Sequence, residues 1–232
     1  MKRMELLLGI LMIITAAAIV NNYKKQTVSS VNSQVEARLN PCIVLDAGHG
    51  GEDSGKVGMN HALEKDINLK IVLLLKKELE KEKIQVILTR MEDTGLYTKN
   101  STNKKIEDLS NRCSIIEKAN PSLAVSIHQN SYHEEEIHGP QVFYYKTSEK
   151  GKLAAQFIQE SFNGLIGEEK NTRKIKANDS YYLLLHTKAP IVICECGFLS
   201  NLEEANQLVT QEYQEKIAKC IASGIINYLK KN

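Results

Sequence analysis

Residues 42–51 read CIVLDAGHGG, a short apolar run that stops at Asp46 and passes into a turn rich in glycine. Runs of β-branched and aliphatic residues bounded by glycine are typical of strands that are buried on both faces. Helices must then cover both sides of the sheet to which such a strand belongs. The stretch therefore predicts a parallel sheet between layers of helices, with polar residues where the strand ends.

The segments that follow alternate between strand and helix patterns. Residues 64–83 carry isoleucine and leucine at nearly helical spacing, whereas residues 90–105 read as a polar loop. We expect a single α/β domain, built on a twisted, mostly parallel β-sheet flanked by helices on both faces. Strands are expected at residues 85–89, 123–127, 141–145 (an edge strand) and 191–195, and helices at residues 109–119, 152–165, 202–208 and 213–229.

The N-terminus has the composition of an export signal. Lys2 and Arg3 precede residues 6–20, which are uncharged and mostly apolar. This stretch is shorter than the roughly 20 residues that span a bilayer comfortably, and no A-x-A cleavage site follows it cleanly. A cleaved signal peptide and a membrane anchor both remain open, and both export the domain. We assign residues 1–22 to the signal or anchor, residues 23–40 to a polar linker and residues 41–232 to the folded domain.

Bulk composition excludes several classes of protein. The chain has 232 residues, enough for one domain with a substantial core, and a formal net charge of +2 that is spread along the sequence. A nucleic-acid-binding protein would carry a clustered basic patch. The five cysteines include no C-x-x-C pair, so neither a zinc ribbon nor a disulfide framework is indicated.

Chemistry-bearing side chains gather where three of the expected strands stop. His49 follows the first strand, His128 follows residues 123–127, and Glu195 ends the last strand. Ligand sites in parallel α/β sheets lie beyond the carboxyl ends of the strands, so these residues should converge on one crevice. Glu195 is hard to explain otherwise, because a buried carboxylate needs a partner, a metal or access to water.

Two histidines and a carboxylate with an open position form the ligand set of catalytic zinc, and a second carboxylate would supply a general base. Glu64, at the start of the first helix, is a candidate for this set, although a carboxylate there is also favoured by the helix N-terminus. His49 and His128 each have a structural alternative as ordinary polar residues at strand ends. Asp46 is either a turn former or a residue that orients a ligand imidazole by a hydrogen bond to the ring nitrogen that does not bind the metal.

The sequence resembles a known family of enzymes. The ordered stretches DAGHGGEDSG, LEKDINL, LTR, SIHQN and ECGFLSN resemble the motifs of zinc-dependent N-acetylmuramoyl-L-alanine amidases, which are bacterial cell-wall hydrolases. Together these motifs span the whole domain, and Ala47 is a mild departure at a position where family members often carry proline. The stretches occupy residues 46–55, 63–69, 88–90, 126–130 and 195–201.

The resemblance implies the site and the reaction. His49, Glu64 and His128 would bind one Zn²⁺ ion, and Glu195 would be the catalytic glutamate. The substrate would be peptidoglycan, cut at the amide between the lactyl group of N-acetylmuramic acid and L-alanine of the stem peptide. Glu195 would take a proton from water and deliver it to the departing amine.

The domain content implies a narrower role. A signal or anchor, a short linker and a catalytic domain are most similar to the sporulation-specific members of the family, which act on the spore cortex in the pathway to muramic-δ-lactam and serve germination. We expect membrane attachment through the N-terminal segment or secretion to the cell wall or the spore intermembrane space. Without a targeting module, the enzyme would depend on the membrane or on a protein partner for localisation or activation.

Three other functions remain open from the residues. A zinc exopeptidase or amidase could act on a different peptide, and product analysis on muropeptides would distinguish it. A cysteine hydrolase would use Cys194 or Cys196 with His128, and would be insensitive to chelators. A non-enzymatic wall-associated binding protein would be expected to lack one of the four site residues, and none is missing.

Overall fold

A computed structural model describes residues 15, 18–26, 41–166 and 173–231 of the chain. The chain divides into an N-terminal unit, residues 1–40, and a folded unit, Pro41–Asn232. Residues 18–26 of the first unit are helical and exposed, and none of the helices in the described ranges combines the length and apolar character needed to cross a membrane. Most of the expected signal or anchor and of the linker lies outside the described residues, so this assignment stays a prediction.

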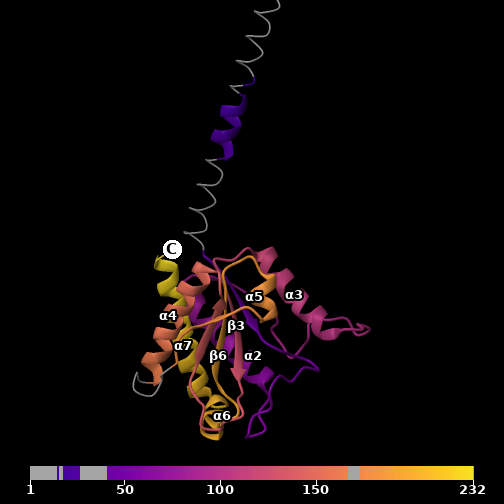
Figure 1. Cartoon of the computed structure of the whole chain (residues 1–232), viewed down its shortest axis with the longest axis vertical. Coiled ribbons are helices and arrows are strands. Elements are labelled where there is room, and N and C mark those ends of the chain that lie inside the picture. The colour runs from indigo at the N-terminus through magenta and orange to yellow at the C-terminus, as the bar shows by residue number, and fades with distance from the viewer. Residues whose placement is uncertain (1–14, 16–17, 27–40, 167–172, 232) are drawn as a thin grey trace, which may run out of the picture. The chain divides into compact units, whose positions relative to one another are not determined.

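The folded unit is built on a six-stranded sheet with the order β2-β1-β3-β6-β4-β5. β3 and β6 lie side by side within it (Figure 1). β1, β2, β3 and β6 pair in parallel, β4 runs antiparallel to β6, and β5 runs parallel to β4. The predicted α/β fold with a mostly parallel sheet is therefore confirmed. The strands are β1 (Cys42–Ala47), β2 (Gln85–Leu88), β3 (Leu123–Asn130), β4 (Gln141–Tyr145), β5 (Lys176–Asn178) and β6 (Ile191–Phe198).

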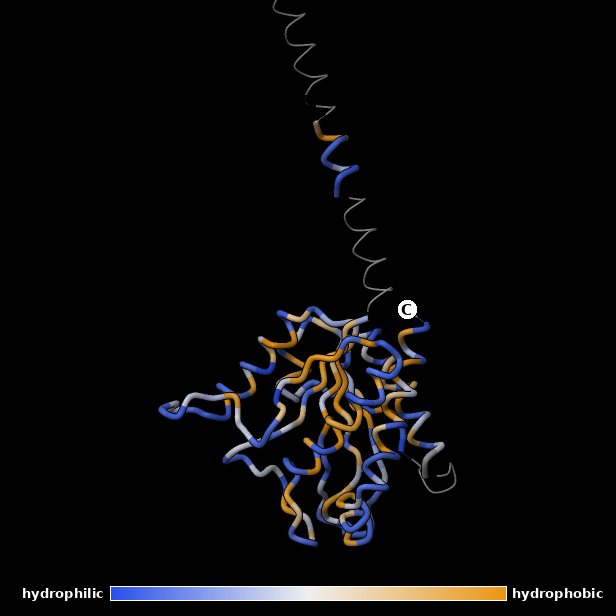
Figure 2. The backbone as a smooth tube through the Cα atoms, turned by 180° about the vertical axis from the view of Figure 1, so that it is seen from behind, coloured by the Kyte–Doolittle hydropathy of each residue, from blue (hydrophilic) through white to orange (hydrophobic). Residues whose placement is uncertain are grey.

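Helices cover both faces of this sheet. α2, α4 and α7 pack over one face in a large apolar cluster, and α3 and α5 pack over the other in a smaller one. The strands form the most hydrophobic part of the unit, as Figure 2 shows. The helices are α2 (Glu64–Lys81), α3 (Lys104–Ala119), α4 (Glu149–Ile166), α5 (Tyr182–His186), α6 (Leu202–Leu208) and α7 (Gln211–Lys231).

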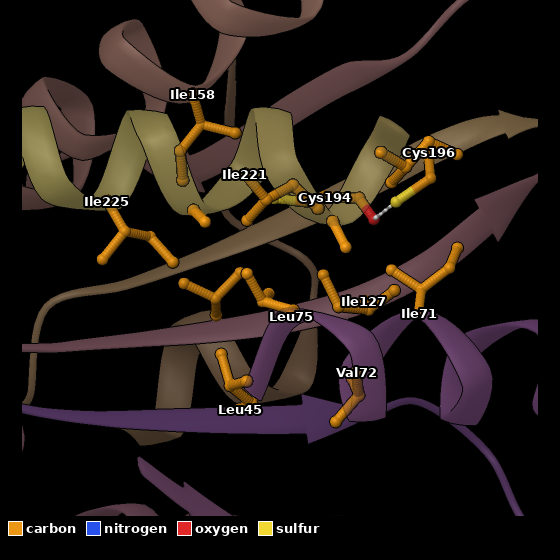
Figure 3. Close-up of a cluster of buried hydrophobic side chains, with 14 of the residues drawn as sticks. Leu45, Ile71, Val72, Leu75, Ile127, Ile158, Cys194, Cys196, Ile221 and Ile225 are labelled. Atoms are coloured by element: carbon orange, nitrogen blue, oxygen red, sulfur yellow. Dashed lines mark hydrogen bonds between the residues drawn. The ribbon is translucent and has the colours of Figure 1, made fainter. Parts of the chain in front are cut away.

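Alternation along β6 directs successive side chains to opposite faces of the sheet. Cys194 and Cys196 belong to the large cluster and lie among side chains of α2 and α7 (Figure 3). Ile193 belongs to the smaller cluster on the opposite face. Glu195 is two residues further along the strand, so its side chain points to the same face as that of Ile193. The two cysteines are therefore packing residues on the face that carries α2 and α7, and Glu195 points to the side of α3 and α5.

Several predicted boundaries were wrong. α3 begins at Lys104 instead of residue 109, because the side chain of Asn103 caps it by accepting a hydrogen bond from the Ile106 N–H at 3.2 Å. β3 and β6 both continue past their predicted ends, so that His128 and Glu195 lie within strands. β4 is an interior strand and not an edge strand, because the unpredicted strand β5 pairs with its outer side.

The contact between α4 and α7 depends on a glycine. A methyl group added at Gly224 of α7 would lie 2.6 Å from the Cα atom of Ile158 in α4, whereas one added at Gly164 of α4 would meet nothing within 4 Å. We expect Gly224→Ala to lower the free energy of unfolding by roughly 1–3 kcal/mol through overpacking. Gly164→Ala should raise it by roughly 0.5–1 kcal/mol, because alanine favours the helix. Urea unfolding of both variants measures the difference, and equal stability of the two would contradict this account.

Candidate active site

Three of the predicted site residues meet although they come from three separate elements. Glu64 is the first residue of α2, His128 lies in β3, and His49 lies in the turn after β1. Oε1 of Glu64 is 3.2 Å from Nε2 of His49 and 2.9 Å from Nδ1 of His128. One potential ligand atom from each residue lies within 4.8 Å of the other two, so the group could hold a metal ion. Their role as ligands stays a prediction.

The Glu64 carboxylate is fixed by backbone donors. It is 2% exposed, and it accepts hydrogen bonds from the N–H of Lys56 at 2.8 Å and of Gln129 at 3.1 Å. Burial by itself would raise the pKa of Glu64, but hydrogen bonds with His128 and His49 hold it well below its usual range. The group is therefore an anion at neutral pH, which is the state that a bound cation requires.

Glycine permits the close approach of the two histidines. A side chain at Gly48 would overlap the imidazole of His128. His49 itself has a φ of 64°, a left-handed conformation that is uncommon outside glycine, and Gly50 follows with a φ of 137°. This turn carries the His49 ring back toward β3, where its centroid is 5.0 Å from that of His128.

Two arginines hold the backbone of this turn. Arg112 donates to the carbonyl oxygens of Ala47 at 2.7 Å and His49 at 2.8 Å. Arg90 donates to the carbonyl oxygens of Ala47 at 2.9 Å and Gly48 at 3.1 Å. Because carbonyl groups buried without donors are costly, these contacts stabilise the one backbone path that places His49 beside Glu64.

Asp46 does not orient an imidazole, so that hypothesis was wrong. Its carboxylate pairs with Arg112 at 2.6 Å and accepts hydrogen bonds from Thr89 at 2.7 Å and Ser126 at 2.6 Å. Although burial opposes it, Arg112 together with these hydroxyls lowers the pKa of Asp46 to about 2. Asp46 therefore anchors the arginine that holds the turn.

Asp53, and not Asp46, contacts an imidazole of this group. Its Oδ2 lies 2.7 Å from Nδ1 of His49, and its Oδ1 accepts a hydrogen bond from the N–H of Gly55 at 3.0 Å. When Nδ1 carries the proton, Nε2 of His49 offers its lone pair to a metal ion; in the absence of an ion, its hydrogen bond with Glu64 needs a proton on Nε2. The motif GGEDSG contains this aspartate, and the turn after His49 was the signal that could have pointed to it.

Glu195 is a buried carboxylate beside this group. It is 7% exposed and pairs in register with His128 of the neighbouring strand. Burial is the main cause that raises the pKa of Glu195 to about 7. Its Oε2 atom is buried and has no hydrogen-bond partner among the described residues. An orphaned buried oxygen of this kind is typical of functional sites.

Two cavities meet at this centre. One, of about 340 Å³, is lined by His49, Glu64, His128 and Glu195, together with Tyr181, which sequence reasoning did not single out. The second, of about 320 Å³, contributes an apolar wall and shares several residues with the first. The shared residues are His49, Asp53, Lys105 and His128. The groove therefore extends beyond the cluster of His49, Glu64 and His128 and can hold a ligand that reaches to one side of it.

The cysteines do not supply a nucleophile to this groove. Cys194 and Cys196 lie on the opposite face of the sheet, and burial raises the pKa of both thiols well above the usual value. A catalytic cysteine needs an accessible thiol with a low pKa next to its histidine. This geometry argues against the cysteine hydrolase.

Several known proteins similar to this chain are N-acetylmuramoyl-L-alanine amidases. The sequence model of the family described as N-acetylmuramoyl-L-alanine amidase matches residues 43–227. The germination-specific N-acetylmuramoyl-L-alanine amidase of Bacillus subtilis (strain 168) is 37% identical over 189 residues, which are 80% of this chain and 78% of that protein.

Solved structures of amidases have the same fold as this chain. The CwlD amidase from Clostridioides difficile, in complex with the GerS lipoprotein, superposes with a TM-score of 0.80 at 41% identity and covers 83% of this chain and 100% of its own. The N-acetylmuramoyl-L-alanine amidase from Clostridium difficile 630 has a TM-score of 0.73 at 28% identity, with 83% of this chain and 98% of its own covered.

Removing the charge of Asp46 should destabilise the fold strongly. We expect Asp46→Asn to lower the free energy of unfolding by about 1.5–3 kcal/mol, because the buried Arg112 would lose one of its two carboxylate partners and keep only Asp108, at 2.5 Å. Asp179→Asn is the matched control: Asp179 pairs with Lys146 at 2.6 Å, but both side chains are more than half exposed, so its loss should leave the free energy of unfolding nearly unchanged.

The same pair gives a pH dependence. The pKa of Asp46 is lowered from 3.8 to about 2, so its stabilising effect is complete above the first value and is lost as the pH falls toward the second. Urea unfolding at decreasing pH should therefore show the wild-type protein and Asp46→Asn converging. A difference that stayed constant down to pH ~2 would contradict the assignment.

Asp53→Asn should weaken metal binding without unfolding the protein. We expect the affinity for Zn²⁺ to fall about 10- to 100-fold, because the His49 ring loses the carboxylate that orients it. Glu52→Gln serves as the control, since the Glu52 carboxylate contacts Lys104 at 2.7 Å and no histidine. Competition with a chromogenic chelator measures both affinities, and equal affinities would show that Asp53 has no such role.

Proposed function

Because the chain belongs to the N-acetylmuramoyl-L-alanine amidase family, we propose that it performs the family's reaction as a zinc enzyme, with His49, Glu64 and His128 as metal ligands and Glu195 as the catalytic glutamate. The bond cut is the amide between the lactyl group of N-acetylmuramic acid and L-alanine of the stem peptide of peptidoglycan. The observation that carries this proposal is the convergence of the four side chains on one cavity.

The chemistry of the donor set fits Zn²⁺. Two imidazoles and one carboxylate are the ligands of many catalytic zinc sites, and these three side chains line a cavity that a substrate could enter. The family is generally zinc-dependent, which supports the same choice. When bound, the ion would act as a Lewis acid that polarises the scissile carbonyl and makes water more acidic.

Glu195 would then move the proton. Its unpaired Oε2 accepts a proton from the water molecule that attacks the lactyl carbonyl carbon. The same carboxylic acid delivers this proton to the nitrogen of L-alanine as the carbon–nitrogen bond breaks, so that the products are a lactyl carboxylate and a free amine. A pKa of about 7 suits a group that must both accept and release a proton near neutral pH.

A role in the spore cortex is the narrower part of the proposal. The supporting observation is the 37% identity to the germination-specific amidase of Bacillus subtilis over most of both chains. Removal of stem peptides would prepare muramic acid residues for conversion to muramic-δ-lactam. Because peptidoglycan lies outside the cytoplasm, the domain would act at the wall or in the spore intermembrane space, with residues 1–22 as its export signal or anchor.

A protein partner is also part of the proposal. The CwlD amidase of Clostridioides difficile has been solved in complex with the GerS lipoprotein, and this chain covers that amidase completely at 41% identity. We therefore infer that an exported protein localises or activates the present enzyme as well.

Two substitutions test the assigned roles. Glu195→Gln should keep the metal and lose about 10²- to 10⁴-fold in turnover, because proton transfer is removed. His49→Ala should lose both metal and turnover, whereas His133→Ala should change neither, since that side chain is 72% exposed in a loop outside the cavity. The measurements are metal analysis of the purified chain and mass spectrometry of digested muropeptides.

The products separate the proposal from its alternatives. A muramoyl amidase releases intact stem peptides from the glycan, whereas an exopeptidase shortens the peptides and leaves them attached. Peptide shortening, or near-normal turnover of Glu195→Gln, would overturn the proposal.

A further inference from the structure

A tyrosine that the reaction scheme leaves without a role stands at the edge of the metal cavity. Tyr181 precedes α5 and lines the cavity together with Glu195 and His128. Its ring packs on Phe143, which pairs with Ile193 of β6, and Glu195 lies two residues further along the same face of that strand. Both side chains line the cavity, so the hydroxyl is placed on the side of α5 where it can reach the carboxylate.

The local structure holds Tyr181 in this place. β5 ends at Asn178, whose Oδ1 accepts hydrogen bonds at 2.8 Å from the N–H of both Ser180 and Tyr181. This side chain closes the turn from β5 into α5. The tyrosine ring packs against Phe143 of β4 with 5.4 Å between ring centroids and an interplanar angle of 59°. Ring and backbone are thus fixed independently of the hydroxyl.

The hydroxyl is a hydrogen-bond donor at neutral pH. Burial, followed by the charge of Glu195, raises the pKa of Tyr181 to about 12. The phenol therefore keeps its proton and can donate a hydrogen bond to the carboxylate. Oε2 of Glu195 has no partner among the described residues, so one oxygen of the carboxylate stays available for water.

We propose that Tyr181 is a positioning residue, whose hydroxyl donates to the Glu195 carboxylate and holds its unpaired oxygen toward the cavity. A glutamate side chain has three rotatable bonds, and freezing them before the reaction removes an entropic cost from the proton-transfer step. The inference rests on the proposed function, because it assigns Tyr181 a role only through the general base.

Tyr182 provides a matched control in the next position of the chain. Its ring stacks on His186 with 3.9 Å between centroids, and it does not line the metal cavity. Tyr181→Phe and Tyr182→Phe each remove one hydroxyl and retain the ring. They therefore separate the hydrogen bond to Glu195 from the packing of aromatic rings around α5.

The experiment compares four variants of the full chain on purified muropeptides: Tyr181→Phe, Tyr182→Phe, Glu195→Gln and the double variant Tyr181→Phe/Glu195→Gln. We expect Tyr181→Phe to lower kcat about tenfold, the effect of one hydrogen bond, with KM, zinc content and Tm unchanged. Tyr182→Phe should match the wild type. In the Glu195→Gln background, Tyr181→Phe should cost nothing further, because its effect passes through the carboxylate.

Four results would overturn the proposal. One is a kcat for Tyr181→Phe within about twofold of the wild type, which is less than one hydrogen bond should cost. Another is an equal loss on adding Tyr181→Phe to Glu195→Gln, which would mean that the hydroxyl acts directly on the substrate. A fall in kcat that came with lost zinc or a lowered Tm would assign the hydroxyl to stability. An equal effect of Tyr182→Phe would make the loss unspecific.

The wild type and Glu195→Gln report separately on the proposed function, so its failure is distinguishable from the failure of this inference.

Discussion

The buried ion pair between Asp46 and Arg112 is the interaction on which the site depends. At the end of β1 the chain must leave the sheet and turn back, which takes backbone carbonyl groups out of the β-ladder while they are still buried. Arg112, held by Asp46 at 2.6 Å, donates to two of these carbonyl oxygens. Without Asp46, the buried guanidinium would keep only Asp108 as a carboxylate partner among the described residues, and the donors that face the turn would lose their anchor. His49 is positioned as a consequence.

The two glutamates of the site are held in opposite states by their surroundings. The Glu64 carboxylate accepts hydrogen bonds from two backbone N–H groups and contacts two imidazoles. These contacts keep its pKa far below the usual range. Glu195 lies in an apolar strand with one oxygen unpaired, and burial raises its pKa to about 7. Pairs of carboxylates whose environments separate their pKa values commonly have different tasks. This contrast supports one glutamate as a ligand and the other as the proton carrier.

Sequence patterns predicted the long elements well and the short ones poorly. α2, α4 and α7 carry enough periodic residues to be recognised locally. β5 has only three residues, so it is a strand only because β4 offers it a partner, and α5 is a single turn of helix for which no period can be detected. The motifs pointed to His49, Glu64, His128 and Glu195, and these four do line one cavity. Tyr181 escaped notice because β5 and α5, which position it, were not predicted.

The sequence alone determined the class of fold, the family and the four residues worth testing, because apolar periodicity and ordered motifs are local properties of the chain. Only the tertiary structure decided which aspartate serves which purpose. Asp46 and Asp53 lie on either side of His49 in sequence, and the left-handed backbone at His49 turns the imidazole toward Asp53 while β1 aims Asp46 at Arg112. The direction of a side chain follows from the path of the backbone, and that path is set by distant arginines that no local pattern reveals.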